Sequence, residues 1–362
     1  MKKTPFILFL VGSLSASLFG GWGQPVPLPL EIRYSFAHLS PDDRQLWYTS
    51  GINYDDIFVA RWNGSGWDSI VHLGPQINTR NRELSPSITA DHRKMYFVAY
   101  GRPGGYGSYD VWCSTWDDTL VDWGDPVNCG PNVNTAYGEC TAFITGDGRK
   151  LYFSSFKDNI IDLDLYVCAW QDTMWGPAIS LGPKVNSFTD DFSPWVSADG
   201  GKLLFVRWAD VYSTDIFQSL WRGAEWDSAQ LVGPPISLGN SISDESPSLS
   251  SDSLRFIFCS NRPSRDSLKR FWESRWEPGS VVKEDGFIFG GGESGIKVMP
   301  NTFTSFTTLP GHSSERFVLY DISGRKVGVY RGDRIGEGLS AGVYFLKPSI
   351  PNAKPLRIVK LR

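Results

Sequence analysis

The sequence contains few of the residues from which metal sites and most hydrolase sites are built. Only 4 histidines and 5 cysteines occur among its 362 residues. They show no zinc-binding or redox spacing, and no serine has the Gly-x-Ser-x-Gly context of a hydrolase nucleophile. We therefore expect no metal, no cofactor and no disulfide scaffold. A single bridge between Cys129 and Cys140, which flank one loop, stays open as an alternative.

An excess of basic residues and long apolar runs are lacking as well. The net charge of −4 speaks against nucleic acid as a partner. An apolar run follows Lys2 and Lys3, and small residues come after it. The run falls short of the roughly 20 apolar residues that cross a membrane. Residues 1–20 are therefore predicted to be a secretory signal peptide, and no transmembrane segment is expected.

Aromatic residues, glycine and proline are abundant in contrast. Aromatics make up 14% of the chain, which has 15 Trp, 37 Gly and 23 Pro, a composition typical of short strands joined by turns. One pattern recurs: Asp, an aliphatic residue, an aromatic residue, three further residues and Trp. It reads "DIFVARW" at 56–62, "DVWCSTW" at 110–116, "DLYVCAW" at 164–170 and "DIFQSLW" at 215–221, with a degraded copy, "RFWESRW", at 270–276.

Each copy of this pattern belongs to a larger unit. A short strand, a turn that contains an Asp, and an aromatic strand precede it, and a second Trp with a Gly/Pro/Asn turn follows it. Each unit thus holds four short strands. Because repeated four-stranded units form the blades of a β-propeller, the sequence predicts an all-β, five-bladed β-propeller. Six blades are the alternative if residues 277–292 contain another unit.

The fifth unit is incomplete, since no second Trp follows its last copy of the pattern. A matching segment lies at the other end of the chain, where "WGQPV" at 22–26 resembles "WGDPV" at 123–127 and "WGPAI" at 175–179. We therefore predict that residues 22–32 form the outer strand of the fifth blade. A propeller over residues 22–289 is then closed by the N-terminal strand, which removes an exposed edge.

These units resemble the TolB-type, WD-like propeller repeats of bacterial envelope proteins. The resemblance rests on "SPSITADHRKMYF", "GRPGGYGSYDVW" and "GPNVNT" and covers residues 30–276. It implies a propeller that stands alone or precedes an OmpA-like domain. No OmpA-like peptidoglycan-binding segment follows here, so that part of the family's function is not carried over.

A tail over residues 296–362 follows a linker at 290–295. From Glu293 onward, 11 basic residues face 5 acidic ones, whereas the rest of the chain has 24 against 34. Such an asymmetry suggests two units with different roles. The tail resembles the C-terminal sorting domain of proteins exported by the type IX secretion system. The matched features are Pro300-Asn301, Leu319-Tyr320-Asp321, Ser323-Gly324-Arg325-Lys326-Val327, Ala341-Gly342-Val343-Tyr344-Phe345 and Ile358-Val359-Lys360-Leu361.

This second resemblance implies a small immunoglobulin-like β-sandwich that follows the propeller. It also implies the type IX secretion machinery as a partner, and a destination outside the cell or on the outer-membrane surface. A plain immunoglobulin-like accessory module is the alternative for the tail.

Acidic residues that repeat from unit to unit are expected to have a structural role, because a residue present in nearly every blade is needed to form the blade. A further acidic set precedes the innermost strand of each blade and shares one face with aromatic and cationic residues. That face is predicted to bind sugars, peptides or a cation, although the acids can instead cap backbone amides. The candidates for this binding face are Glu83, Arg102, Tyr106, Tyr109, Glu139, Asp191, Trp208, Glu245 and Arg262.

The sequence thus favours an exported, non-catalytic propeller that binds a protein or a glycan. The alternative is a glycoside hydrolase or a sialidase-like enzyme that uses carboxylates in the central funnel. Such an enzyme needs non-equivalent acids, whereas the acids here follow the repeat. We therefore lean against an enzyme and assign no catalytic residue.

Overall fold

The computed structural model describes most of the chain. The described residues are 21–30, 36–51, 55–157, 162–208, 213–238, 242–262, 270–277, 302–303, 316–321, 326–331, 334–336, 339, 342–348 and 356–360. The chain divides into two compact units, one formed by Trp22–Trp276 and the other by Met1–Gly21 with Glu277–Arg362. The predicted signal peptide and linker lie outside the described residues, so both stay predictions.

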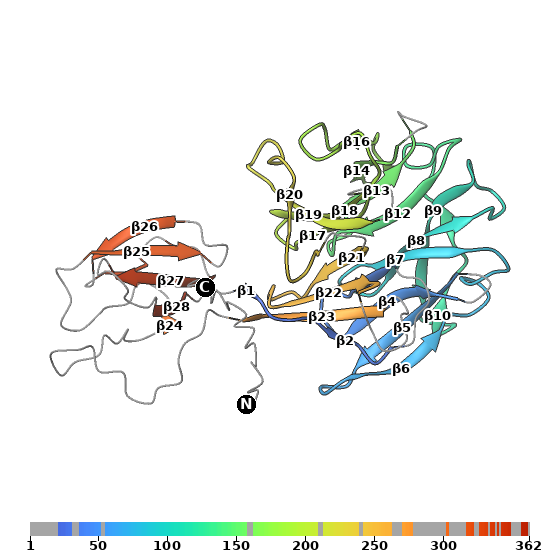
Figure 1. Ribbon diagram of the computed structural model, residues 1–362. Coiled ribbons are helices and arrows are strands. Elements are labelled where there is room, and N and C mark those ends of the chain that lie inside the picture. The colour runs from blue at the N-terminus through green and yellow to red at the C-terminus, as the bar shows by residue number, and fades with distance from the viewer. Residues whose placement is uncertain are drawn as a thin grey trace, which may run out of the picture. The chain divides into compact units, whose positions relative to one another are not determined.

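The Trp22–Trp276 unit contains five antiparallel sheets that form the blades of a propeller (Figure 1). Blade one consists of β3 (Ala37–Leu39), β4 (Gln45–Ser50), β5 (Asp56–Trp62) and β6 (Trp67–His72). Blade two consists of β7 (Glu83–Ile88), β8 (Lys94–Tyr100), β9 (Tyr109–Asp117), β10 (Asp122–Trp123) and β11 (Val127–Asn128). Blade three consists of β12 (Glu139–Ile144), β13 (Lys150–Ser155), β14 (Asp164–Gln171), β15 (Met174–Trp175) and β16 (Ile179–Ser180).

The last two blades have the same order of strands. Blade four consists of β17 (Asp191–Val196), β18 (Lys202–Trp208), β19 (Thr214–Leu220) and β20 (Gln230–Leu231). Blade five consists of β21 (Asp244–Leu249), β22 (Arg255–Ser260), β23 (Arg270–Glu277), and the N-terminal strands β1 (Gly21–Trp22) and β2 (Val26–Pro27). The prediction of an all-β, five-bladed propeller is confirmed.

The N-terminal segment completes blade five through backbone pairing with β23. Val26 and Pro27 pair with Glu273 and Trp272, and the amides of Gly23 and Leu28 donate to carbonyl oxygens of the same strand at 2.8 Å each. These bonds occupy an edge that an open sheet would leave free. The pairing predicted for the segment that contains "WGQPV" is therefore present.

Paired tryptophans show why this segment repeats a motif found inside the chain. In each of the first four blades a Trp within one residue of the end of the third strand contacts a second Trp edge to face, at centroid distances of 5.1–5.5 Å: Trp62–Trp67, Trp116–Trp123, Trp170–Trp175 and Trp221–Trp226. In blade five Trp276 meets Trp22 at 5.4 Å. The first residue of "WGQPV" is thus the second Trp of the fifth pair.

The turns between the first and second strands of the blades hold the repeated aspartates. A Ser or Thr hydroxyl donates to the Asp carboxylate in every blade, at 2.5–2.6 Å, from Ser40, Thr89, Thr145, Ser197 and Ser250. These bonds lower the pKa of Asp91 and Asp199 below its usual range, so the carboxylates stay ionised and keep accepting. The architectural interpretation of this acidic set is confirmed.

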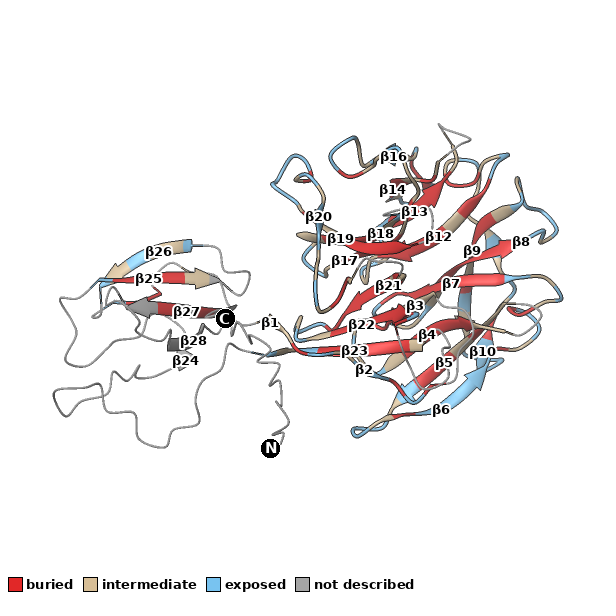
Figure 2. Cartoon of the chain, in the orientation of Figure 1, coloured by how far each residue is buried: buried red, intermediate tan, exposed pale blue. Residues whose placement is uncertain are grey.

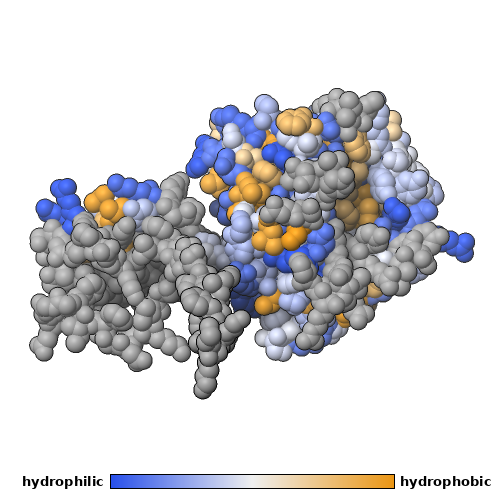
Figure 3. Space-filling view, in the orientation of Figure 1, coloured by the Kyte–Doolittle hydropathy of each residue, from blue (hydrophilic) through white to orange (hydrophobic). Residues whose placement is uncertain are grey.

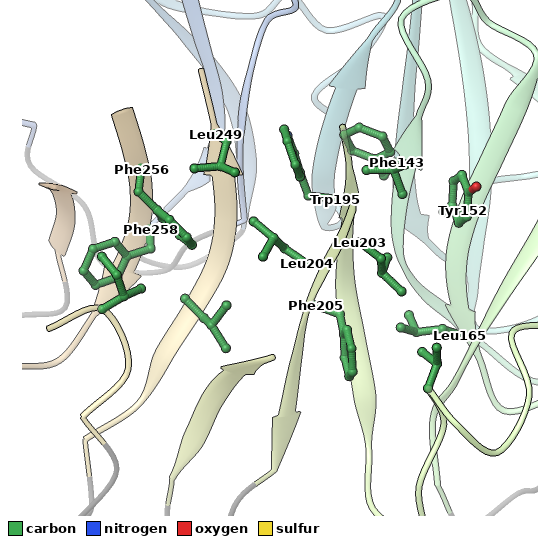
Figure 4. Packing of buried hydrophobic residues seen from close by; sticks show 14 of the residues in the cluster. Phe143, Tyr152, Leu165, Trp195, Leu203, Leu204, Phe205, Leu249, Phe256 and Phe258 are labelled. Carbon is green, nitrogen blue, oxygen red and sulfur yellow. The ribbon is translucent and has the colours of Figure 1, made fainter. Parts of the chain in front are cut away.

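The innermost strands lie side by side around the axis, and aromatic residues fill the spaces between blades. Each innermost strand contacts its neighbours, with β3 between β21 and β7. Burial follows the strands of the blades, whereas their ends and outermost strands are exposed (Figure 2). One cluster runs from Tyr152 in blade three through Phe205 in blade four to Phe256 in blade five (Figure 4). On the face seen in Figure 3, hydrophobic residues form small groups among hydrophilic ones.

The C-terminal unit contains one described five-stranded sheet in the order β24-β28-β27-β25-β26. Its strands are β24 (Thr302–Phe303), β25 (Arg316–Asp321), β26 (Lys326–Arg331), β27 (Gly342–Pro348) and β28 (Leu356–Lys360). Phe317, Leu319, Ile335, Tyr344 and Leu346 form its buried cluster. A single described sheet does not establish the immunoglobulin-like sandwich, which stays a prediction.

The five cysteines, all of which are described, are free thiols. Cys129 and Cys140 therefore do not form the bridge that the sequence left open. Burial raises the pKa of the Cys140 thiol to about 12, so it is protonated and unreactive at neutral pH. Within the described ranges, no helix has the length and apolar character needed to span a membrane.

Candidate functional site

One face of the propeller carries longer loops than the other. It is formed by the loops that join the second and third strands of each blade and by the loops that lead from one blade into the next. We call it the loop face, and its opposite, with the short turns, the turn face. The candidates predicted from the sequence belong to the loop face, but the structure places them at different depths.

The acidic candidates lie inside the blades rather than on the surface. Glu83, Glu139 and Asp191 are buried, each as the first residue of an innermost strand. Each accepts hydrogen bonds from the backbone amide and the hydroxyl of a Thr or Ser four residues earlier, at 2.6–3.0 Å: Thr79, Thr135 and Ser187. The acids thus hold the loop that enters their own blade.

In blade five Asp244, and not Glu245, takes this position. Asp244 is buried, and its carboxylate accepts from the amide of Leu238 at 3.0 Å. Glu245 is half-buried one residue further on and accepts from the hydroxyl of Thr214 at 3.2 Å. Since Asp244 and Glu245 are adjacent acids, the sequence did not distinguish them.

Arginines neutralise three of these buried carboxylates. Arg262 and Arg207 approach Asp244 and Asp191 at 2.8 and 2.7 Å, and Arg102 lies 3.9 Å from Glu83. Each guanidinium also stacks on two aromatic rings of its own blade and donates to carbonyl oxygens of the loop that enters the blade. Arg102 and Arg262 therefore stabilise loops.

Glu139 differs because, among the described residues, no arginine pairs with it. Ser155 donates to its carboxylate at 2.8 Å, and the cation in that loop, Lys157, instead lies over the ring of Tyr166. Burial raises the pKa of Glu139 to about 7. A carboxyl with this pKa is partly protonated at neutral pH, so Glu139 is a buried acid that titrates near neutral pH.

The stability of the propeller is expected to depend on pH through Glu139. Its pKa is raised from 4.5 to about 7 on folding, so the folded state holds a proton that the unfolded chain releases. The resulting stabilisation is full below pH 4.5 and is lost as pH rises through 7, by about 3 kcal/mol. Glu139→Gln should remove this loss, because an amide can accept from the Thr135 amide and donate to the two hydroxyls. Urea unfolding at pH 5 and pH 8 measures the free energy of unfolding of both proteins. If the variant and the wild type differed in this free energy by the same amount at pH 5 and at pH 8, the prediction would be contradicted.

The surface of the loop face is aromatic. Tyr106 and Trp208, both predicted from the sequence, are 52% and 38% exposed, and Phe188 is 89% exposed. Tyr100 and Tyr137 are also exposed. Tyr109 is half-buried, with its ring 5.0 Å from that of Tyr100. Exposed aromatic rings in several neighbouring loops are typical of a surface that binds another molecule.

Two groups of these aromatics lie where a loop between two blades meets a loop or strand end within a blade. In the first, the amide of Ser108, beside Tyr106, donates to the carbonyl of Tyr137 at 3.1 Å. In the second, the hydroxyl of Thr189, beside Phe188, donates to the carbonyl of Trp208 at 3.2 Å. The groups therefore consist of Tyr100, Tyr106, Tyr109 and Tyr137 around blade two, and Phe188 and Trp208 around blade four.

The axial channel is narrow and carries no acid among the described residues that line it. Its free space is about 20 Å³, bounded mainly by the Ser-Pro steps Ser85-Pro86, Ser193-Pro194 and Ser246-Pro247, with His38 and Phe143. The Nε2 atom of His38 and the Oγ atom of Ser193 have no hydrogen-bond partner. Burial lowers the pKa of His38 to about 3, so the imidazole is neutral. Within the described ranges no group of three His, Cys, Asp or Glu residues can hold a metal ion.

Sequence reasoning missed Tyr100, Tyr137 and Phe188. Phe188 lies one residue after Ser187, where blade two has Arg80 and blade three has Ala136. Blades two and three form without an aromatic residue at this position, so the blade itself does not require one. This departure from the repeat was the signal in the sequence that pointed to Phe188.

These features define a class: a five-bladed β-propeller with buried, neutralised loop-face acids and an exposed aromatic surface. No protein-family model matches the chain, and the curated proteins contain no match. Solved structures do match. They include TolB from Acinetobacter baumannii, at 15% identity and a TM-score of 0.42, with 68% of this chain and 55% of that chain covered.

Two further matches cover a larger share of the solved structure that they match. One is described as TolB from Agrobacterium tumefaciens, with 12% identity, a TM-score of 0.43 and coverage of 90% of this chain and 89% of that chain. The other is an endo-arabinase from Bacteroides thetaiotaomicron VPI-5482, with 14% identity, a TM-score of 0.43 and coverage of 73% and 100%. The chain spans only about half of the Acinetobacter protein. Values this low carry no argument about activity, which has to be argued from this chain's own residues.

Proposed function

We propose that this chain is an exported, non-catalytic β-propeller that binds a protein or a glycan through the aromatic side chains of its loop face. The observation that carries the proposal is the contrast between the loop-face acids and the loop-face aromatics. The acids are buried and bonded to their own loops, whereas Tyr106, Phe188 and Trp208 project into solvent. A ligand that reaches this face meets rings.

The same contrast speaks against the glycoside hydrolase alternative. Glycosidases place two carboxyl groups on either side of the scissile bond, about 5–10 Å apart and open to the sugar. Here Asp191 and Asp244 are held by arginines, and Glu139 lies beneath the loop that it caps. The described lining of the axial channel consists of serine, proline, alanine, histidine and aromatic residues, which supply no such pair.

Aromatic rings fit both classes of ligand, since they pack on the C–H faces of sugars and form the anchors of protein interfaces. Replacing Tyr106, Tyr137, Phe188 and Trp208 together by Ser should weaken binding at least about tenfold, because anchors of this kind each contribute more than 1 kcal/mol. The thermal unfolding midpoint should barely change, since these side chains are exposed.

Glycan arrays and binding to purified envelope proteins, compared for the wild type and this variant, measure the effect. Met174→Ser, which removes an exposed apolar residue from β15 on the turn face, is the matched control and should bind as the wild type does. Wild-type affinity of the fourfold variant for every ligand that the wild type binds would refute the loop face as the binding surface.

We propose further that the tail sorts the chain to the type IX secretion system after export by residues 1–20. The matched motifs at Leu319-Tyr320-Asp321 and Val343-Tyr344-Phe345, and the β-strands β25 and β27 that contain them, support this proposal. Its test is the location of a chain that lacks residues 293–362. Retention in the periplasm would support the proposal, and unchanged surface delivery would reject it.

A further inference from the structure

A groove of about 670 Å³ lies between blades one and two, on the side of the turn face. Its floor includes the buried rings of Trp47 and Trp123, and Trp116 lines it as a half-buried ring. Trp123 meets Trp47 and Trp116 edge to face at 5.8 and 5.5 Å. This groove is separate from the loop-face aromatics, and neither the architecture nor the proposed function accounts for it.

The groove coincides with a break in the repeat. The second strand of a blade begins with a cation in blades two to five, namely Lys94, Lys150, Lys202 and Arg255, whereas blade one has Gln45 at this position. Blade one is therefore the only blade whose second strand, among the described residues, begins without a positive charge.

Two of these cations show what the position does. Lys94 of blade two lies over Trp170 of blade three at 5.2 Å. Arg255 of blade five lies over Trp62 and Trp67 of blade one at 5.3 and 5.5 Å. In both cases the cation of one blade covers a Trp of the next blade, a favourable cation–π arrangement.

At the boundary of blades one and two, no cation of the described part of the chain lies over Trp116 or Trp123 in this way. Gln45 turns instead to its neighbours: its Oε1 lies 3.1 Å from Nδ1 of His92 and accepts from Nε1 of Trp47 at 3.0 Å. The groove lies beside this residue, next to the Trp116–Trp123 pair. The aromatic ring of a cation–π contact is therefore present at this boundary, and the groove beside it has room for a cation.

The walls of the groove suit a cation with a hydrocarbon stem. Three aspartates line it: Asp118 is paired with Arg93 at 2.6 Å, while Asp91 and Asp122 accept from backbone amides. The pKa of Asp91 is lowered by the hydroxyl of Thr89, so it remains ionised. Two cations, Arg93 and Arg61, line the groove as well. The exposed aliphatic side chains of Val71 and Val121 complete the rim.

We propose that this groove binds an alkylammonium or guanidinium group, supplied by a lysine or arginine side chain of a partner polypeptide. The cation stacks on Trp116 where Lys94 and Arg255 stack at the corresponding boundaries, the aspartates complement its charge, and the valines contact its methylene stem. The 670 Å³ of the groove exceeds one side chain, so adjacent residues of the polypeptide fit as well.

The sharpest test restores the repeat. Gln45→Lys places the missing cation over Trp116, so it should fill the site and weaken binding of a labelled Gly/Ser peptide with one central lysine about tenfold in a fluorescence anisotropy titration of the full chain. Trp116→Leu should weaken binding to a similar extent by removing the ring, which keeps the test conclusive if the first variant fails to fold. Gln230→Lys, the same substitution at an exposed position of β20, is the matched control and should stay within twofold of the wild type.

The probes identify the ligand. Lysine and arginine peptides should bind, and a peptide with glutamine in place of the lysine should not. Equal binding of the glutamine peptide, or unchanged binding by Gln45→Lys, would overturn the proposal. Free 1,5-diaminopentane should bind more weakly than the lysine peptide, and an equal or higher affinity would overturn the assignment to a polypeptide.

Discussion

A chain without residues 21–30 is expected not to form a closed propeller. This segment supplies β1 and β2, the only outer strands of blade five within the described residues, and it buries Leu28 and Leu30. The ring of Trp22 lies 5.2 Å from Phe256 and 5.4 Å from Trp276. Each buried leucine alone contributes about 2–5 kcal/mol, and total stabilities of about 5–15 kcal/mol are usual. The loss is therefore comparable to the whole stability.

Circular dichroism and size-exclusion chromatography measure this outcome. The shortened chain should unfold without a cooperative transition and should associate through the open edge of β23, whereas a chain that lacks only residues 1–20 should fold. Adding a peptide of residues 21–32 in trans should restore the transition. A cooperative melt of the shortened chain within a few degrees of the longer one would contradict closure by the N terminus.

Single substitutions grade the same effect. Leu30→Ala should cost about 2–5 kcal/mol because this side chain is almost fully buried. Val26 lies four residues before Leu30, and its side chain is exposed. Val26→Ala should therefore cost about 0.5 kcal/mol or less, and it is the control for a substitution in the same segment that does not change the interior.

Replacing Arg262 should have the second largest effect on stability. The guanidinium of Arg262 is buried, pairs with Asp244 at 2.8 Å and donates to the carbonyls of Pro235 and Ile236. Arg262→Leu leaves Asp244 as an unpaired buried carboxylate, whose pKa is already raised by burial. Breaking such a pair costs about 3–5 kcal/mol. Urea unfolding at pH 7 measures the loss.

Two companion variants show whether the loss comes from the stranded charge. Asp244→Asn combined with Arg262→Leu removes both charges and should recover a substantial part of the stability, since the penalty lies mainly in the unpaired ion. Arg222→Leu removes an arginine from the solvent-exposed pair with Asp227, whose side chains are 46% and 42% exposed, and should destabilise the fold far less than Arg262→Leu, because water screens the pair. A loss with Arg222→Leu as large as with Arg262→Leu would count against a special role of burial.

The architecture was predictable because each blade needs the same residues. A Trp pair, a turn Asp and a hydroxyl recur in every blade, and the same need explains why Trp22 at one end of the chain could be matched with Trp276 near the other. Closure of the ring can therefore be predicted from the sequence, because a strand that completes a repeat carries the motif of that repeat even when it lies at the other end of the chain.

The depth of the loop-face acids was harder to predict. A carboxylate next to an innermost strand can bind a ligand at the surface or accept hydrogen bonds from its own loop, and the sequence pattern is the same in both cases. Which role it has depends on whether the loop folds back over it. The spacing between Thr79 and Glu83, repeated as Thr135 and Glu139, was the available signal of capping. It pairs a hydroxyl with an acid four residues later, as a local hydrogen bond requires.

A parallel assay of binding and hydrolysis on one panel of polysaccharides, with envelope proteins assayed for binding alone, tests the proposal that the loop-face aromatics bind a ligand that the loop-face acids do not cleave. We expect ligands to be bound without release of new sugar ends, and binding to fall when Tyr106, Tyr137, Phe188 and Trp208 are replaced. Hydrolysis by the wild type that Glu139→Gln or Asp191→Asn abolishes would contradict the proposal, because carboxylates assigned here to holding loops would then carry the reaction.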